Sequence, residues 1–193
     1  MWLYQIIIKT YRLIASIYAL FNNKAKQFVA GRKNVFQHLK DHIPPDKHII
    51  WIHCASLGEF EQGRPLIDQL KKESADNFIL LTFFSPSGYE VRKNYPNADY
   101  VTYLPIDTKK NARQFINTVK PAKALFVKYE FWLNFIDELY NKNIPFYLIS
   151  GIFRKKQHFF QWYGEIFKAR LKKFTHFYLQ DEPSAALLSQ LGL

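Results

Sequence analysis

The feature that most limits the fold of this sequence is a regular alternation of apolar runs and amphipathic segments after Pro44. The apolar runs are short and rich in β-branched and aromatic residues, as buried strands are, and each is followed by apolar residues at helical spacing. Strands that are apolar throughout and alternate with helices predict a parallel sheet with helices on both faces. We therefore predict an α/β, Rossmann-like domain. The expected strands are residues 47–55, 77–84, 99–107, 122–130, 144–151 and 175–180, and the expected helices are residues 60–74, 85–95, 108–120, 131–143, 157–174 and 181–193.

The chain before this alternation has a different character. Residues 2–21 are apolar except for Lys9, Arg12 and a few neutral polar residues, the chain then turns polar and basic, and residues 1–24 are predicted to form a membrane-associating helix. About 20 apolar residues can span a bilayer, but two cations near its centre are costly. A spanning anchor, an amphipathic helix lying on the membrane and a helix packed on the domain therefore all stay open. Residues 25–46 are expected to be a connector with one short helix, and residues 47–193 the Rossmann-like domain.

The charge of the chain points to an anionic partner. The formal net charge is +11 and the isoelectric point is about 9.6, which suits phospholipid head groups, a phosphorylated substrate or nucleic acid. A solvated basic surface is the alternative, and we expect no nucleic-acid partner because no recognisable binding module is present.

The cysteine and histidine residues predict no metal site. Cys54 is the single cysteine and therefore cannot form a disulfide within the chain. His53 precedes it, but neighbouring strand residues point to opposite faces, so the two cannot form a simple catalytic pair. The six histidines are scattered without a metal-ligand spacing.

The segment "ASLGE", residues 55–59, follows the first predicted strand. Ligands bind outside the carboxyl ends of strands in open parallel sheets. The small residues Ser56 and Gly58 allow a sharp turn and the close approach of a ligand, and Glu59 falls in the first turn of the next helix. Two interpretations stay open for Glu59: an acid stabilised by the helix dipole, or a general base that takes a proton from a ligand hydroxyl.

Further candidate binding residues follow three other predicted strands. Hydroxyls and backbone N–H groups at a helix start suit a phosphate, and so does a forked arginine. Each group also has a purely structural interpretation, as a helix start, a surface Lys–Glu pair or a basic loop. The candidates are Ser85, Ser87 and Gly88 after the second strand, Lys128 and Glu130 after the fourth, and Arg154 after the fifth.

Several separated blocks together resemble the N-terminal half of 3-deoxy-D-manno-octulosonic acid (Kdo) transferases. They occur in the order found in that family and cover about residues 49–193. The blocks are "WIHCASLGEFEQGRPLI", "LLTFFSPSGYEVRKNY", "ADYVTYLPIDTKKNARQFINTVKPAKALFVKYEFW", "IPFYLISGIFR" and "FTHFYLQDEPSAALLSQLG".

The resemblance implies the N-terminal half of a two-domain GT-B glycosyltransferase of lipopolysaccharide biosynthesis. Such enzymes transfer Kdo with inversion, without metal or other cofactor, at the cytoplasmic face of the bacterial inner membrane. The N-terminal domain binds the lipid A precursor, a tetraacyl disaccharide bisphosphate, and the C-terminal domain binds the donor CMP-Kdo.

The family motifs also imply roles for individual residues. The glutamate of the "ASxGE" motif, which acts as the base, corresponds to Glu59. The acid of a "KxExW"-like block corresponds to Glu130, with Lys128 beside it. The segment "SGIFR" departs from the arginine-rich version of other branches, so the resemblance supports Arg154 less than the other candidates.

The resemblance stops before the donor-binding half. The sequence is therefore expected to be a piece of a larger protein that cannot complete the transfer alone. The alternative function is a non-catalytic, basic module that binds lipid at a membrane surface, in which Glu59 would play no part.

Overall fold

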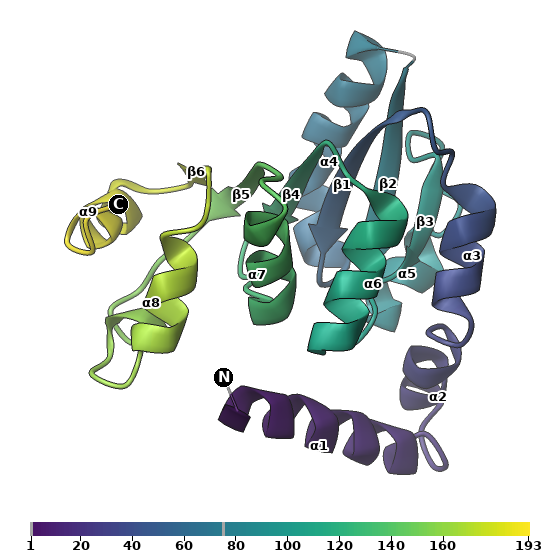
Figure 1. Cartoon of the computed structure of the whole chain (residues 1–193), viewed down its shortest axis with the longest axis horizontal. Helices are drawn as coiled ribbons and strands as arrows, with labels where there is room; N and C mark the ends of the chain where they lie inside the picture. The colour runs from purple at the N-terminus through teal and green to yellow at the C-terminus, as the bar shows by residue number, and fades with distance from the viewer. Residues whose placement is uncertain (1, 75) are drawn as a thin grey trace.

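The computed structural model describes residues 2–74 and 76–193 and confirms the predicted α/β class. Parallel strands form one sheet in the order β3-β2-β1-β4-β5-β6, with helices on both faces (Figure 1). The central strand β1 pairs with both β2 and β4, as in the Rossmann arrangement. The strands are β1 (His48–Cys54), β2 (Asn77–Phe83), β3 (Tyr100–Tyr103), β4 (Lys123–Val127), β5 (Phe146–Gly151) and β6 (His176–Leu179). The helices are α1 (Trp2–Tyr18), α2 (Asn23–Ala30), α3 (Val35–His42), α4 (Leu57–Glu73), α5 (Pro86–Arg92), α6 (Lys109–Val119), α7 (Leu133–Asn141), η1 (His158–Phe160), α8 (Glu165–Leu171) and α9 (Glu182–Ser189).

The core lies in two layers, one on each face of the sheet. On one face, Trp51 of β1 packs against Phe115 of α6 and Phe135 of α7, with ring centroids 4.8 and 5.6 Å apart. On the other face, α4 buries Phe60 and Ile67 against the inner strands. The alternation of side chains along the strands feeds both layers, which explains why the strands are apolar throughout.

Two expectations about the helices were wrong. The aromatic spacing of residues 157–174 predicts one long helix, but the chain forms the short turn η1, a loop and α8. A Cβ on Gly164 would come within 1.8 Å of the His158 carbonyl oxygen. The loop can therefore double back at this position only with glycine. Phe159 reaches the core from η1, so two short elements produce a spacing that imitates one helix. Residues 25–46 hold α3 and most of α2, rather than one short helix.

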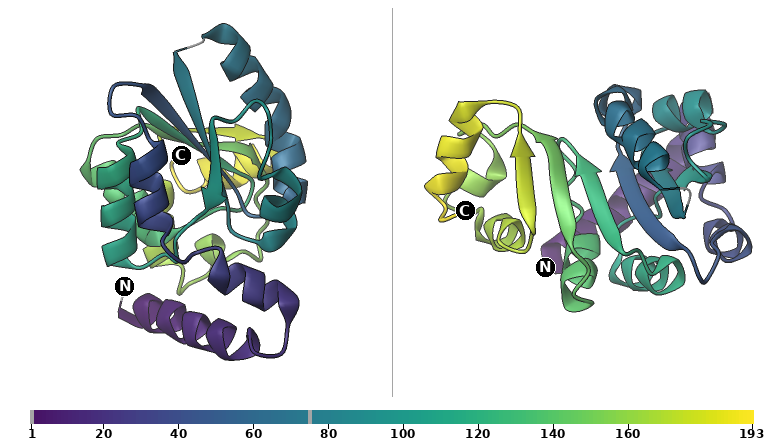
Figure 2. Two further views of the ribbon diagram at one scale, coloured as in Figure 1. Left: turned by 90° about the vertical axis from the view of Figure 1, so that its right-hand side faces the viewer. Right: turned by 90° about the horizontal axis from the view of Figure 1, so that it is seen from above.

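Helix α1 crosses the carboxyl edge of the sheet (Figures 1 and 2). The Tyr4 hydroxyl donates to the Asp107 carboxylate, and the Gln5 amide donates to Asn134 Oδ1 at 2.7 Å. Ile8 is buried beneath the helix. Within residues 2–74 and 76–193, no helix combines the length and the apolar character that crossing a bilayer requires.

The outer face of α1 is apolar and exposed. Its aliphatic side chains are between 40% and 63% accessible to solvent. Helix faces that point away from a domain are normally polar, so this exposed surface needs an explanation. The side chains are Leu3, Ile6, Ile7, Leu13, Ile14 and Ile17.

Candidate functional site

The candidate residues gather at the carboxyl edge of the sheet. Glu59 follows β1 and Glu130 follows β4, and these strands pair directly although the acids lie far apart in the chain. After β3, the chain crosses over to β4, on the other side of β1. In doubly wound sheets, ligands bind in the crevice that this crossover creates. The structure therefore brings Glu59 and Glu130 to the same end of neighbouring strands.

Glu59 lies in the first turn of α4, as predicted from the sequence. Ser56 is the N-cap of this helix, and its hydroxyl donates a hydrogen bond to the Glu59 carboxylate. Gly58 is exposed, and a Cβ on it would meet only Ser56 Oγ, at 3.9 Å. Glu59 is half-buried, and its carboxylate accepts from one hydroxyl of its own turn, beside the exposed Gly58.

Glu130 is in a very different environment, because it is only 6% exposed. Its Oε2 lies 2.9 Å from Nε2 of the fully buried His53 and accepts from the Trp132 indole at 2.5 Å. The other His53 nitrogen, Nδ1, lies 2.8 Å from Thr82 Oγ1, which also accepts from the Trp51 indole at 2.8 Å. We call Trp51, His53, Thr82, Glu130 and Trp132 the buried polar cluster. It ties β1, β2 and the end of β4 together.

Cys54 faces away from this cluster, as the strand alternation predicts. It is fully buried in the apolar layer with Phe60 and Val127. Burial, followed by the charges of Glu130 and Glu59, raises the pKa of the Cys54 thiol well above its ordinary value. A thiol that stays protonated is a poor nucleophile, so Cys54 serves packing.

The turn after β4 and the last residues of β5 carry unusual backbone angles. Lys128 has φ 67° and Ser150 has φ 55°, both in the left-handed region that side chains other than glycine adopt at a cost of about 1–3 kcal/mol. Lys128 Nζ lies 5.8 Å from the centre of the Tyr129 ring. Strain of this kind collects where a fold must hold side chains in a fixed place.

Gly88 has a structural reason of its own. A Cβ at this position would lie 2.2 Å from the Phe83 ring, so α5 can approach β2 only with glycine here. The hydroxyls of Ser85 and Ser87 lie 2.7 Å apart at the start of α5. They are the polar groups of this turn that face solvent.

Arg154 lies at the far end of the edge, after β5. Its guanidinium donates to Asp181, the N-cap of α9, at 2.9 Å, and the Arg154 side chain is 56% exposed. The pKa of Asp181 is lowered mainly by the hydrogen bonds from Ser184 and, to a smaller extent, by the Arg154 ion pair. A phosphate would have to compete with Asp181 for this arginine.

Apolar cavities separate α1 from the strand ends. One has a volume of about 240 Å³ and lies beside Trp132, and a second of about 480 Å³ leads to Ser85. Tyr11 and Phe84 line both, so the two form one apolar groove along α1. The first is lined by Ile7, Ile8, Tyr11, Phe84, Ile106, Asp107 and Trp132.

Two features of the edge were missed in the sequence. The sequence shows only that His53 and Cys54 cannot act as a pair. The contact between His53 and Glu130 becomes apparent only once β1 and β4 are known to be neighbours. Asp107 ends the third predicted strand without a sign of its role, but it is fully buried and accepts from Tyr4 and from the Asn134 and Phe135 backbones. Over residues 2–74 and 76–193, no group of three His, Cys, Asp or Glu residues has a metal-binding arrangement.

The sheet order and the polar carboxyl edge define a Rossmann-like α/β domain of the kind that glycosyltransferases use. A family model for 3-deoxy-D-manno-octulosonic-acid transferase (kdotransferase) matches residues 25–193, and the chain belongs to this family.

Individual relatives agree with this assignment. The chain is 30% identical over 189 residues to a bifunctional glycosyltransferase/methyltransferase of Fusobacterium nucleatum, covering 94% of this chain and 28% of the relative. It is 34% identical over 108 residues to the 3-deoxy-D-manno-octulosonic acid transferase of Haemophilus influenzae, covering 55% and 25%. The corresponding enzyme of Aquifex aeolicus is 35% identical over 107 residues, covering 52% and 30%. The chain thus spans less than a third of the length of these relatives.

Proposed function

We propose that this domain binds the lipid A precursor and that Glu59 takes the proton from the acceptor hydroxyl as Kdo is transferred from CMP-Kdo. The observation that carries this proposal is the position of Glu59. It is a half-open carboxylate at the carboxyl edge, in the first turn of α4, with open space beside Gly58. The bifunctional relative and the Kdo transferases support the reaction class.

The proposed reaction needs one base and no metal. The acceptor oxygen forms a bond to the anomeric carbon of Kdo while the bond from that carbon to the CMP phosphate breaks. CMP leaves with the bonding electrons from the opposite side, so the configuration inverts. The acceptor proton passes to Glu59, and the Ser56 hydroxyl keeps the carboxylate in place. CMP-Kdo would bind to a second domain, as the GT-B arrangement requires.

The other candidates would hold the acceptor. Ser85, Ser87 and Lys128 present polar groups to solvent at the same edge, and Arg154 would contribute after leaving Asp181. Gly88 lets α5 bring the two hydroxyls to this edge. Because Glu130 is buried, we assign it a positioning role through His53 and Trp132 rather than direct contact with the sugar.

The membrane would supply the acceptor. The outer face of α1 exposes aliphatic side chains beside Lys9 and Arg12, a pattern that suits an interfacial helix on an anionic surface. We propose that the domain works at the cytoplasmic face of the bacterial inner membrane. The same observation favours the second candidate function, a lipid-binding module without catalysis.

One substitution distinguishes the two functions. In the complete enzyme, Glu59→Gln should lower the rate of Kdo transfer from CMP-Kdo to the lipid A precursor by about 10²–10⁴-fold, the usual contribution of a general base. Glu73→Gln, an exposed acid at the other end of α4, is the matched control and should leave the rate unchanged. Normal transfer by the Glu59 variant would exclude it as the base.

A further inference from the structure

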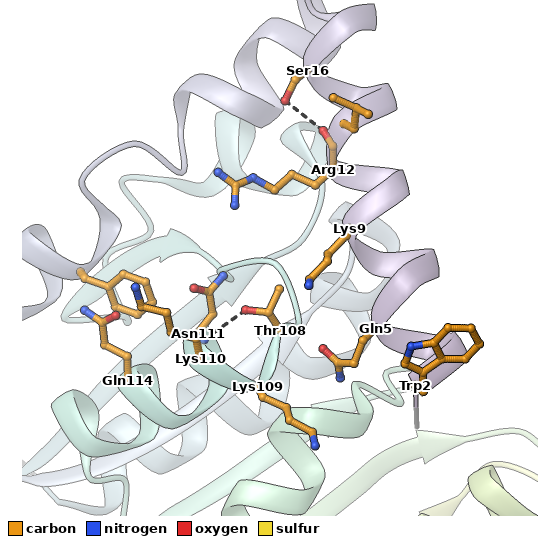
Figure 3. Close-up of a pocket in the computed structure, with 12 residues that line it drawn as sticks. Trp2, Gln5, Lys9, Arg12, Ser16, Thr108, Lys109, Lys110, Asn111 and Gln114 are labelled. Carbon is orange, nitrogen blue, oxygen red and sulfur yellow. Dashed lines mark hydrogen bonds between the residues drawn. The ribbon is translucent and has the colours of Figure 1, made fainter.

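A large, open pocket separates α1 from the start of α6 (Figure 3). Its volume is about 1140 Å³. None of the nine candidate residues of the proposed transferase site lines it, so the pocket is a separate feature of the domain. The lining residues are Trp2, Gln5, Lys9, Arg12, Leu13, Ser16, Phe36, Thr108, Lys109, Lys110, Asn111 and Gln114.

The pocket is positively charged without compensation. Lys9 points from α1 toward Thr108 at the start of α6, while Arg12 extends sideways from α1 (Figure 3), and the first turn of α6 supplies Lys109 and Lys110. No acid lines the pocket, and none of the four cations forms an ion pair with any residue in the described part of the chain. On the opposite face of the sheet, by contrast, four cations in α4 and at the end of α5 have acidic partners within 3.2 Å. These pairs are Arg64 and Arg92 with Glu61, Lys71 with Asp99, and Lys93 with Glu90.

Neutral polar groups and the helix geometry add to this charge. Thr108 caps α6, accepting from the Asn111 backbone at 3.2 Å, and the positive end of the α6 dipole faces the same space. Gln114 and Ser16 stand at the rim. The pocket therefore combines four cations with neutral hydrogen-bonding side chains, which is the chemistry that phosphate recognition uses.

The position of the pocket on α1 indicates the source of that anion. Lys9 and Arg12 occupy the flank of α1 that borders the pocket, while Leu3, Ile6 and Ile17 lie on its exposed outer face. An interfacial helix buries its apolar face about 5–10 Å into the boundary between head groups and acyl chains. Cations just behind that face then lie at the depth of the lipid phosphates.

We propose that this pocket binds the phosphate monoester of a membrane lipid whose acyl chains lie beside the outer face of α1. The pocket thereby fixes the rotation of the domain on the membrane. The inference rests on the membrane contact proposed above, but not on Glu59 or on transfer. A monoester fits a strongly basic pocket better than a diester because it carries up to two charges and three free oxygens, where a diester carries one charge.

The test is vesicle binding by this chain. Phosphatidylcholine vesicles contain either phosphatidic acid, a monoester, or phosphatidylserine, a diester, adjusted to the same zeta potential. Lys109→Gln/Lys110→Gln should lower affinity for the phosphatidic acid vesicles by about tenfold to thirtyfold, and for the phosphatidylserine vesicles by less than about threefold. Both lysines are exposed on α6, and far-UV circular dichroism checks the fold.

A matched double variant controls for total charge. Lys40→Gln/Lys142→Gln removes two exposed lysines at the ends of α3 and α7 and should change neither affinity. Equal losses on both vesicle types for the Lys109/Lys110 variant would mean diffuse attraction and would overturn the proposal.

Two further outcomes separate this proposal from the function proposed above. If the chain binds neither vesicle but binds glycerol 3-phosphate in a manner that needs Lys109 and Lys110, the ligand is a free phosphate and the lipid is wrong. If Glu59→Gln leaves transfer intact in the complete enzyme while the monoester preference persists, the base assignment fails and the headgroup pocket stands.

Discussion

The carboxylates at the carboxyl edge lie in two opposite environments, an open turn after β1 and closed ends after β3 and β4. Glu59 is half-buried and bonded to one hydroxyl from its own turn. Glu130 and Asp107 are buried and bonded to groups from β1, α1 and α7. The difference teaches that three acids at one edge need not share a role: one can meet a ligand, while two hold the edge in shape.

Removing Glu130 should have the largest effect on stability. We expect Glu130→Ala to lower the free energy of unfolding by about 3–5 kcal/mol, because it breaks the buried contact with His53 and removes one of the two acceptors of the Trp132 indole. Glu59→Ala should cost less than about 1 kcal/mol, the usual contribution of an acid at a helix start. Urea titration followed by tryptophan fluorescence measures both losses of unfolding free energy. Equal losses would contradict the difference between the closed and the open environment.

Asp107 should make stability depend on pH. Burial is the main cause that raises the pKa of Asp107 from 3.8 to about 6, while hydrogen bonds from Tyr4, Asn134 and Phe135 oppose the shift. The folded state thus binds the proton more tightly than the unfolded state. The stabilisation is complete below pH 4, is lost as the pH rises through 6, and amounts to about 3 kcal/mol.

The variant Asp107→Asn isolates this effect. Its free energy of unfolding should show a weaker decline between pH 4 and pH 7 than that of the unmodified chain. Subtracting the two curves cancels the remaining titratable groups. A difference that stays constant over this range would mean that burial does not raise the pKa of Asp107. The closed environment would then not change how a carboxylate binds its proton.

The two helix-start glycines sharpen the comparison at smaller energies. Gly88→Ala should destabilise the domain by about 1–3 kcal/mol, because the new methyl would overlap the Phe83 ring. Gly58→Ala has open space around it and should stay within about 1 kcal/mol of the original stability. Thermal unfolding of both variants checks the order, and a reversed order would contradict the packing assigned to α5.

Ser56→Ala should have the smallest effect on stability. Among the described residues, its hydroxyl caps no backbone group of α4 and bonds only to Glu59, so the expected cost is about 0.5 kcal/mol, at the low end for N-cap residues. In the complete enzyme, the fall in transfer rate can be expressed as a free energy. A value larger than this loss of stability would show that Ser56 positions the base. Ser74→Ala, beyond the other end of α4, is the control.

The sequence predicted the fold class because the pattern is local. Each apolar run is a strand, and Glu59 falls in the first turn of a helix that begins at Leu57. The buried polar cluster was not predicted, since His53 and Glu130 are 77 residues apart and meet only through the pairing of β1 with β4. The left-handed angles of Lys128 and Ser150 were equally hidden, because neither residue type signals such a conformation.

The failure at residues 157–174 has a different cause. Aromatic side chains at helical spacing predict a helix when they cover one continuous face. Here Phe159 enters the core from η1, and Phe167 packs against it from α8, with ring centroids 6.1 Å apart. Tertiary packing of large rings can thus reproduce a helical period without a helix between them.

The hydrogen bonds that dock α1 have a consequence for synthesis in the cell. Tyr4 and Gln5 bond to residues made 103 and 129 positions later. At about 5–20 residues per second, α1 is synthesised roughly 5–26 s before its docking partners. During that interval both its inner and outer apolar faces lack protein contacts, so the nascent helix is free to meet a membrane or a chaperone before the domain is complete.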